Sequence, residues 1–290
     1  MNMPGCLSHA DLDRLLAEDI PYGDLTTLSL AQLSSWQRCG TMSMTARYDM
    51  RLCGTEEVQQ LLNHMNVAVE ASLASGVSVT AGTPLLQARG HSQTLLAAWK
   101  LTQTLLEWAS GVASAVAHMV AAATAINPNA VVACTRKTVP FTRVLAAKAV
   151  RAGGGSMHRL NLSDSVLLFP EHLQFLSGSL CSLDAIAALR RAAPERSLVA
   201  EVLDVEQARE WAAHVQVLQL EKFPVQAVAQ VAAYIKERGL STVLAAAGGV
   251  NPSNAGDYVA AGAQVLVTSW PYQAKPCDVQ VNFAADDADA

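Results

Sequence analysis

Two short basic segments in this chain have the residue types and spacing of an anion-binding site. Arg136 and Lys137 directly follow the apolar run VVAC, and His158 and Arg159 follow a run of three glycines. Basic side chains at the end of a buried strand are unfavourable unless they face a cleft and an anion, and arginine pairs with carboxylates and phosphates in bidentate fashion. We therefore expect these four residues to line one cleft that binds negatively charged ligands.

Acidic residues, glycines and a hydroxyl follow the later apolar runs. Glu201 lies in LVAEV, Glu221 ends VLQLE, Gly248 and Gly249 follow VLAAA, and Thr268 ends VLVT. An unpaired carboxylate inside an apolar run is unfavourable, which favours a functional role for Glu201. A glycine pair can bring backbone N–H groups close to a phosphate. The combination predicts a polar site rather than a solvated surface.

Alternating strands and helices must position these residues. After residue 127, Ala-rich stretches of helical periodicity separate short apolar runs that begin near residues 131, 165, 198, 215, 242 and 264. With a further strand at Met157, about six or seven β/α units predict a parallel sheet, which could be an α/β barrel or an open sheet. In a barrel, the ends of the strands gather catalytic groups at one mouth, where the polar residues above would lie.

The residues before 127 mix strands and helices, which indicates a separate α+β region. Ser8 is the expected N-cap of a first helix, and Asp24 is expected to act as a turn or cap residue. Between residues 92 and 126 we expect two helices with a break at Ser110-Gly111, near which the first domain should end. The predicted domains are residues 1–115, 116–275 and a C-terminal tail at 276–290, whose acidic end is expected to be disordered.

Composition limits the class of protein. The formal net charge is -5 and the pI is near 5.8, which argues against a general nucleic-acid binder. The sequence has no run of about 18 apolar residues and no signal-peptide pattern, so we expect a cytoplasmic protein with no membrane segment. The six cysteines show no metal-ligand spacing, and we expect reduced, structural thiols.

The motifs TRKT at 135–138, AxKAVRAGGGSMHRLNLSDSVLL, EVLD at 201–204 and LQLEKF at 218–223 resemble quinolinate phosphoribosyltransferase, also called nicotinate-nucleotide pyrophosphorylase (carboxylating). The resemblance covers nearly the whole chain. It implies an α/β fold with an N-terminal α/β sandwich domain and a C-terminal open α/β barrel. It also implies a homodimer in which each N-terminal domain reaches over its partner's barrel.

The resemblance assigns roles to the polar residues. It implies that Lys137, Glu201 and Glu221 are catalytic, and that both glutamates face the ribose or a magnesium ion bound with the phosphoribosyl donor. Carboxylates suit Mg²⁺, which takes further oxygens from a diphosphate. The implied substrate-binding residues are Lys100, presented by the neighbouring subunit, and Arg136, His158, Arg159, Phe169, His172, Gly248, Gly249 and Thr268.

Several positions depart from the family pattern. Phe169 replaces a lysine that is expected to contact both substrates, and it is either an ordinary core residue or a new wall of the acceptor pocket. Phe141 replaces a glycine, which matters if that glycine has a positive φ. Lys100 replaces an arginine, and Lys222 follows Glu221 where the family has Asp-Asn. These changes resemble the ModD group of the family, which is associated with molybdenum transport.

Other charged residues have competing interpretations. His172 and Glu171 could supply polar groups in place of the family lysine, while Arg143 and Lys148 are expected to be solvent or phosphate-rim charges. Three functions remain open. The favoured one is a phosphoribosyltransferase that joins an acidic or heteroaromatic acceptor to the ribose and releases diphosphate. The others are quinolinate phosphoribosyltransferase itself, and a non-enzymatic protein that binds an oxyanion or nucleotide in molybdenum handling.

Overall fold

The computed structural model describes residues 7–33, 39–177 and 181–286, and its contacts divide the chain into two compact units. The first unit comprises the residues up to Ala115, Val139–Gly154 and the residues from Tyr272 onward. The second comprises Val116–Thr138 and Gly155–Pro271.

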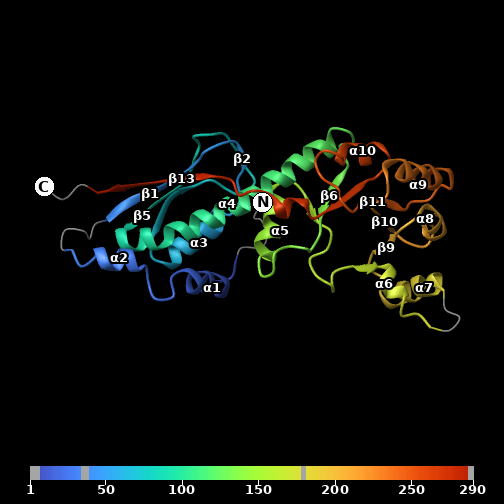
Figure 1. Ribbon diagram of the computed structural model, residues 1–290, viewed down its shortest axis with the longest axis horizontal. Helices are drawn as coiled ribbons and strands as arrows, with labels where there is room; N and C mark the ends of the chain where they lie inside the picture. Colours follow the sequence, from blue (N-terminus) through green and yellow to red (C-terminus); the bar gives the residue numbers. More distant parts are fainter. Residues whose placement is uncertain (1–6, 34–38, 178–180, 287–290) are drawn as a thin grey trace. The chain divides into compact units, whose positions relative to one another are not determined.

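An antiparallel sheet forms the centre of the first unit. Within the described residues it has four strands in the order β13-β1-β5-β3, and β13 lies beside β1 in Figure 1. Met42, Met44 and Ala46 alternate with less buried residues along β1, so one face of the sheet carries the core. The strands are β1 (Cys39–Ala46), β3 (Ala68–Ser72), β5 (Pro84–His91) and β13 (Val279–Ala285), with a separate pair β2 (Met50–Arg51) and β4 (Ser78–Val79).

The helices of the first unit begin at the predicted caps. Ser8 accepts a hydrogen bond from Asp11 N, and Asp24 accepts one from Thr26 N, so both predicted cap residues are confirmed. The helices are α1 (His9–Asp19), α2 (Leu25–Leu30), α3 (Thr55–His64), α5 (Arg143–Ala152) and α4 (Ser92–Thr124), which continues into the second unit.

Helix α4 is continuous, so the predicted break at Ser110-Gly111 is wrong. Ser110 Oγ accepts a hydrogen bond from Cys53 N at 3.0 Å and donates one to Cys53 O at 3.2 Å. A Cβ atom built at Gly111 would lie 2.4 Å from Lys275 O. The glycine therefore allows another backbone segment to approach the helix, and it does not end the helix.

Helix α4 is also long and apolar enough to cross a membrane by length and composition, and it is the one such helix among the described residues. Of its most apolar window, 56% is buried. Leu106, Val116 and Met119 are fully buried, which is typical of a helix in the core of a globular domain. The composition of α4 is therefore explained by protein packing.

A curled parallel sheet forms the second unit. In the described part of the chain it has seven strands in the order β7-β6-β12-β11-β10-β9-β8. Among the strands of this sheet, β12 is the last along the chain and pairs with β6, which is the first. The two edge strands are β7 and β8. This arrangement is a barrel that is open between β7 and β8, so the predicted fold class is confirmed. The strands are β6 (Val131–Cys134), β7 (Ser156–Met157), β8 (Val166–Leu168), β9 (Leu198–Val202), β10 (Val217–Glu221), β11 (Val243–Ala247) and β12 (Val265–Thr268).

Helices follow the strands of this sheet. Leu218, Leu220 and Leu266 are fully buried on the face that packs against helices. The opposite face carries Ala245 and Val267, which belong to a small apolar cluster inside the curled sheet. The helices are α6 (Pro170–Leu173), α7 (Ser182–Ala192), α8 (Val205–Trp211), α9 (Val225–Glu237) and α10 (Ala255–Ala260), and the 3-10 helix η1 (Trp270–Gln273) follows β12.

The segment at 276–290, which the sequence suggests is a tail, contributes strand β13 to the first unit. The acidic residues 287–290 lie outside the described residues. Within the described chain the cysteines Cys39, Cys53, Cys134, Cys181 and Cys277 are free thiols, as expected, and Cys6 lies outside that part.

Candidate functional site

The ends of β6 and β7 bring the predicted basic residues together. These strands pair in parallel, and His158 N donates a hydrogen bond to Cys134 O at 2.8 Å, which sets His158 beside the start of the TRKT segment. Arg159 is 8% exposed. Burial and the nearby Arg136 guanidinium lower the pKa of Arg159, and burial and Arg159 lower the pKa of His158. The site thus contains two close guanidinium groups and a histidine that favours its neutral form.

Phe169 lies at the edge of this basic cluster, at the end of β8. Its ring centroid lies 5.7 Å from Arg159 Cζ and 5.8 Å from the ring of His172, which it stacks against. The backbone N–H of Phe169 donates to His172 Nδ1 at 2.9 Å, so the His172 side chain caps the start of its own helix α6. Phe169 is half-buried and contacts two residues of the predicted site, which favours the wall of a binding site over an ordinary core position.

The two predicted carboxylates lie on neighbouring strands. Gln219 Nε2 donates to Glu201 Oε2 at 2.6 Å. Burial raises the pKa of Glu201, the hydrogen bond from Gln219 lowers it, the charges of Glu221 and Glu171 raise it, and Lys137 lowers it, with a net increase. Since these charges act over short distances, Lys137 lies within electrostatic reach of the carboxylates. Of the predicted basic residues, Lys137 is the one whose charge affects Glu201.

The glycine pair after β11 has a backbone that other residues adopt only with strain. Gly248 and Gly249 have φ values of 82° and 81°. A Cβ atom at Gly248 would lie 2.5 Å from Lys222 Cγ and 2.8 Å from Glu221 Oε1, whereas one at Gly249 would meet no atom within 4 Å. Position 248 thus requires glycine because Glu221 and Lys222, at the end of β10, leave no room for a side chain. The backbone of Gly249 is open to a ligand.

Thr268 supports this glycine loop from β12. Its hydroxyl donates to Val250 O at 2.7 Å and accepts from Trp270 N at 3.0 Å, and the residue is 4% exposed. The hydroxyl therefore has two protein partners and holds the loop after Gly249. A direct contact of Thr268 with substrate stays a prediction.

Two departures from the family pattern fall on left-handed backbone. Phe141 has a φ of 68° and is 100% exposed, and Lys222 has a φ of 55°. The backbone at position 141 thus has a positive φ, which is the condition under which replacing a glycine there matters. A non-glycine residue in this region is unfavourable by about 1–2 kcal/mol. Lys222 N donates to Ala247 O at 2.8 Å, which holds the strained turn beside the glycine pair.

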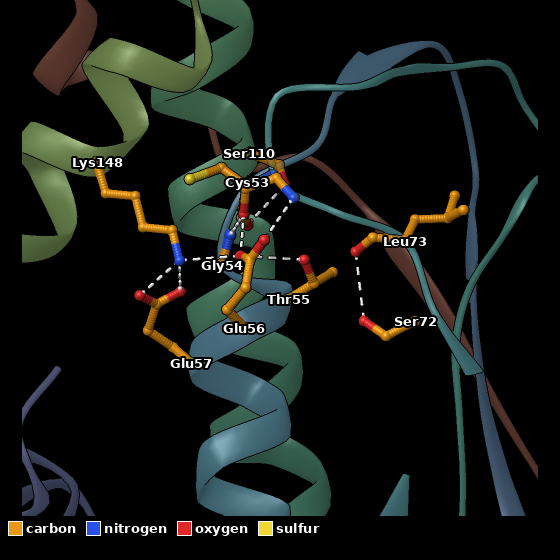
Figure 2. A network of polar contacts seen from close by, with 10 residues as sticks. Cys53, Gly54, Thr55, Glu56, Glu57, Ser72, Leu73, Ser110 and Lys148 are labelled. Atoms are coloured by element: carbon orange, nitrogen blue, oxygen red, sulfur yellow. Dashed lines mark hydrogen bonds and ion pairs between the residues drawn. The ribbon is translucent and has the colours of Figure 1, made fainter. Parts of the chain in front are cut away.

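Lys100 and Lys148 belong to the first unit. Lys100 Nζ donates to Gln103 Oε1 at 3.2 Å and lies 3.9 Å from the ring centroid of Trp99. Lys148 is fully buried, and its Nζ lies 2.6 Å from Glu57 Oε2 and 2.9 Å from Glu56 Oε2 (Figure 2). The prediction that Lys148 is a solvent or phosphate-rim charge is therefore wrong. The local helical pattern gave no sign of carboxylates 91 residues away.

The predicted magnesium ion can be tested against the donors present. No group of three or more His, Cys, Asp or Glu side chains that could hold a metal occurs in residues 7–33, 39–177 and 181–286. Glu201 and Glu221 are two carboxylates within electrostatic reach of each other. Mg²⁺ uses one or two carboxylates, waters and substrate phosphates in such sites, so this donor set fits it when a phosphorylated substrate is bound.

Gln219 is a site residue that sequence analysis missed. It is 5% exposed and occupies the same face of β10 as Glu221, two residues later. Residues two apart on a strand lie on the same face, so the position of Gln219 beside the predicted site carboxylate Glu221 could have been recognised from the sequence.

Comparisons with known proteins agree with this architecture. The model of the quinolinate phosphoribosyl transferase C-terminal domain matches residues 112–282, and that of the N-terminal domain matches residues 24–110. A protein of Rhodobacter capsulatus named ModD, a proposed pyrophosphorylase, is 47% identical over 242 residues, which cover 83% of this chain and 92% of that protein. A ModD protein of Pasteurella multocida is 37% identical and covers 94% of this chain and 96% of its own length. The crystal structure of NadC from Streptococcus pyogenes has a TM-score of 0.85 and 25% identity, with 96% of each chain covered.

Proposed function

Since this chain belongs to the quinolinate phosphoribosyl transferase family, and is thereby a pentosyltransferase of the phosphoribosyltransferase class, we propose that it acts on an acceptor other than quinolinate. The acceptor is acidic or heteroaromatic and the donor is 5-phosphoribosyl 1-diphosphate. Diphosphate is the second product. We also propose a role in molybdenum handling, because the sequence departs from the family pattern in the way that the ModD group does.

The observation that carries this proposal is the joined set of charges at the ends of β6, β9 and β10. The charges of Lys137 and Glu221 both act on Glu201, and the Arg136–Arg159 cluster lies at the end of β6 and β7. Anionic groups of the donor and of the acceptor are attracted to the cations. The uncharged ribose is the part of the donor that fits beside two carboxylates.

These residues support a dissociative transfer. The bond between ribose C1 and the diphosphate oxygen breaks with its electron pair on the diphosphate, and a nucleophilic atom of the acceptor forms the new bond to C1. Glu201 and Glu221 stabilise the positive charge that develops on the ribose, and Lys137 stabilises the leaving diphosphate. Glu201 and Glu221 would also hold Mg²⁺. When bound, this ion would neutralise part of the negative charge of the diphosphate.

The nature of the acceptor rests on Phe169. A phenyl ring beside Arg159 offers an apolar, stacking surface at a position where the resemblance expects a cation. A dicarboxylate such as quinolinate loses one charge partner there, while an acceptor with an aromatic or less charged edge gains a packing surface. We also propose a cytoplasmic homodimer with small anionic substrates, without nucleic-acid or membrane partners, in which Lys100 reaches the partner's site.

Diphosphate release from 5-phosphoribosyl 1-diphosphate and Mg²⁺, measured across a panel of acidic and heteroaromatic acceptors, tests the proposal. Wild-type protein should show acceptor-dependent release that disappears in Lys137→Ala and persists in Lys236→Ala, an exposed lysine on α9. Release that is unchanged in Lys137→Ala would refute the mechanism. Efficient formation of nicotinate mononucleotide from quinolinate would refute the choice of acceptor. Tight molybdate or nucleotide binding without turnover of any donor would instead favour a binding protein.

A further inference from the structure

The inner face of the curled sheet carries an amide where a filled barrel has an apolar side chain. Gln219 is 5% exposed and lies opposite Glu201 on β9 and Ala245 on β11. Barrel interiors are dominated by bulky branched residues such as valine, isoleucine and leucine. At this level the three neighbouring strands instead present a carboxylate, an amide and a methyl group.

Only one end of this amide has a partner. Gln219 Nε2 donates to Glu201 Oε2 at 2.6 Å, while Gln219 Oε1 is a buried oxygen without a hydrogen-bond partner among the described residues. Buried acceptors without a partner are unfavourable, and they are rare in folded proteins. The oxygen is thus available to a hydrogen-bond donor on a ligand, at the place where the carboxylates lie.

The charges around Gln219 decide which part of the substrate lies there. The carboxylates of Glu201 and Glu221 repel phosphate groups and an acidic acceptor molecule, so the diphosphate can approach them only through Mg²⁺. The ribose is the uncharged part of the phosphoribosyl donor, and its two neighbouring ring hydroxyls are hydrogen-bond donors. A diol matches a site in which an amide oxygen adjoins carboxylates.

We propose that Gln219 is a specificity-determining residue, which positions Glu201 through Nε2 and accepts a hydrogen bond through Oε1 from a ribose hydroxyl of the donor. This inference rests on the proposed function, because it takes 5-phosphoribosyl 1-diphosphate as the ligand. It adds a contact that selects ribose over deoxyribose. The acceptor molecule plays no part in it.

A cycle of protein and ligand changes tests the contact. Binding of 5-phosphoribosyl 1-diphosphate with Mg²⁺, and of its 2-deoxy and 3-deoxy ribose analogues, is measured by calorimetry without acceptor for wild type, Gln219→Met and Gln230→Met. Gln230 is an exposed glutamine on α9 and is the matched control. Wild type and Gln230→Met should bind the donor at least about tenfold more tightly than one deoxy analogue. Gln219→Met should lose most of that preference. Methionine has no amide oxygen, so a deoxy analogue leaves no oxygen of this side chain without a hydrogen bond.

The outcomes separate the two proposals. If wild type binds the donor and Gln219→Met keeps the full preference for both hydroxyls, the contact is wrong while the proposed function stands. If wild type binds neither the donor nor the analogues, both the proposed function and this inference fail. A general loss of stability in Gln219→Met would lower all affinities together and leave the ratio unchanged, which also contradicts the contact. Should Gln219→Met not fold, as judged by circular dichroism, Gln219→Leu takes its place in the same cycle.

Discussion

Replacing Lys148 by methionine is expected to destabilise the first unit by about 3–5 kcal/mol, because it leaves a buried carboxylate without its partner. The side chain of Lys148 is 1% exposed and that of Glu57 is 0% exposed. The ammonium group donates to both oxygens of Glu57, at 2.7 and 2.6 Å, and lies 2.9 Å from Glu56 (Figure 2). Methionine fills a similar volume, so the change isolates the charge.

The magnitude follows from what each variant leaves behind. In Lys148→Met, Glu57 has no compensating cation in a buried position, and this is the case in which loss of one partner is strongly destabilising. In the double variant Lys148→Met/Glu57→Met, both charges are removed together, and the free energy of unfolding should return to within about 1–2 kcal/mol of wild type. The coupling energy between the two positions is therefore large and favourable.

Urea unfolding with thermal melts measures these differences. The single variant should lower the melting temperature by on the order of 10 °C. Lys236→Met, at an exposed position of α9, should change stability by less than about 0.5 kcal/mol. A Lys148→Met protein as stable as wild type, or a double variant no more stable than the single one, would refute the reasoning.

The same contacts predict a dependence on pH. Burial alone raises the pKa of Glu56, but hydrogen bonds from Ser75 and Lys148 outweigh burial and lower it to about 2. A carboxyl group whose pKa is lowered on folding stabilises the fold above its unfolded pKa of about 4.5, and that stabilisation disappears as the pH falls towards 2. Acid titration of stability should therefore show a smaller loss over this range in Lys148→Met than in wild type.

Three further changes have expected outcomes. Phe141→Gly should raise stability in urea unfolding by up to about 1 kcal/mol, since it removes left-handed strain from a side chain that is fully exposed. Gly111→Ala should lower stability by about 2 kcal/mol in the same assay, because the new Cβ atom would lie 2.4 Å from a backbone oxygen. Burial raises the pKa of Glu201, so its ionisation destabilises the fold, and Glu201→Gln should gain stability relative to wild type as the pH rises from about 4 to about 7.

Each of these changes has a check. Phe175→Gly, at another exposed phenylalanine that has no positive φ, should not stabilise the protein, and equal gains at both positions would contradict the strain argument. Gly256→Ala, where the nearest atom would lie 3.5 Å away, should be tolerated. A stability difference between Glu201→Gln and wild type that does not change with pH would exclude a raised pKa.

The alternation of strands and helices could be predicted from the sequence, because the strands are short apolar runs that polar residues follow, whereas the open barrel was implied only by the family resemblance. Arg136 and His158 could be predicted to lie in one site, since the ends of parallel strands meet at one edge of the sheet. Local patterns failed where a remote segment decides the structure. Gly111 lies inside the continuous helix α4 and leaves room for the backbone of Lys275. In the sequence, such a glycine cannot be distinguished from one that ends a helix.

The polar network shows the same limit. The Lys148 ammonium finds its carboxylates on α3, and neither the spacing within α5 nor that within α3 indicates the partner. Strand β13 was missed because its partner β1 lies near the other end of the chain, and because acidic residues follow it. The sequence shows that Gln219 is polar. It does not show that Oε1 lacks a hydrogen-bond partner, because this depends on which residues of β9 and β11 lie opposite Gln219.

Strand β13 also imposes an order on biosynthesis. Strand β1 emerges early from the ribosome, whereas its partner at Val279–Ala285 is translated only after the whole parallel sheet. At about 5–20 residues per second, β1 waits on the order of tens of seconds with one edge unpaired. An unpaired edge is a template for association with other chains. The nascent first unit therefore keeps one open sheet edge until its last strand is synthesised.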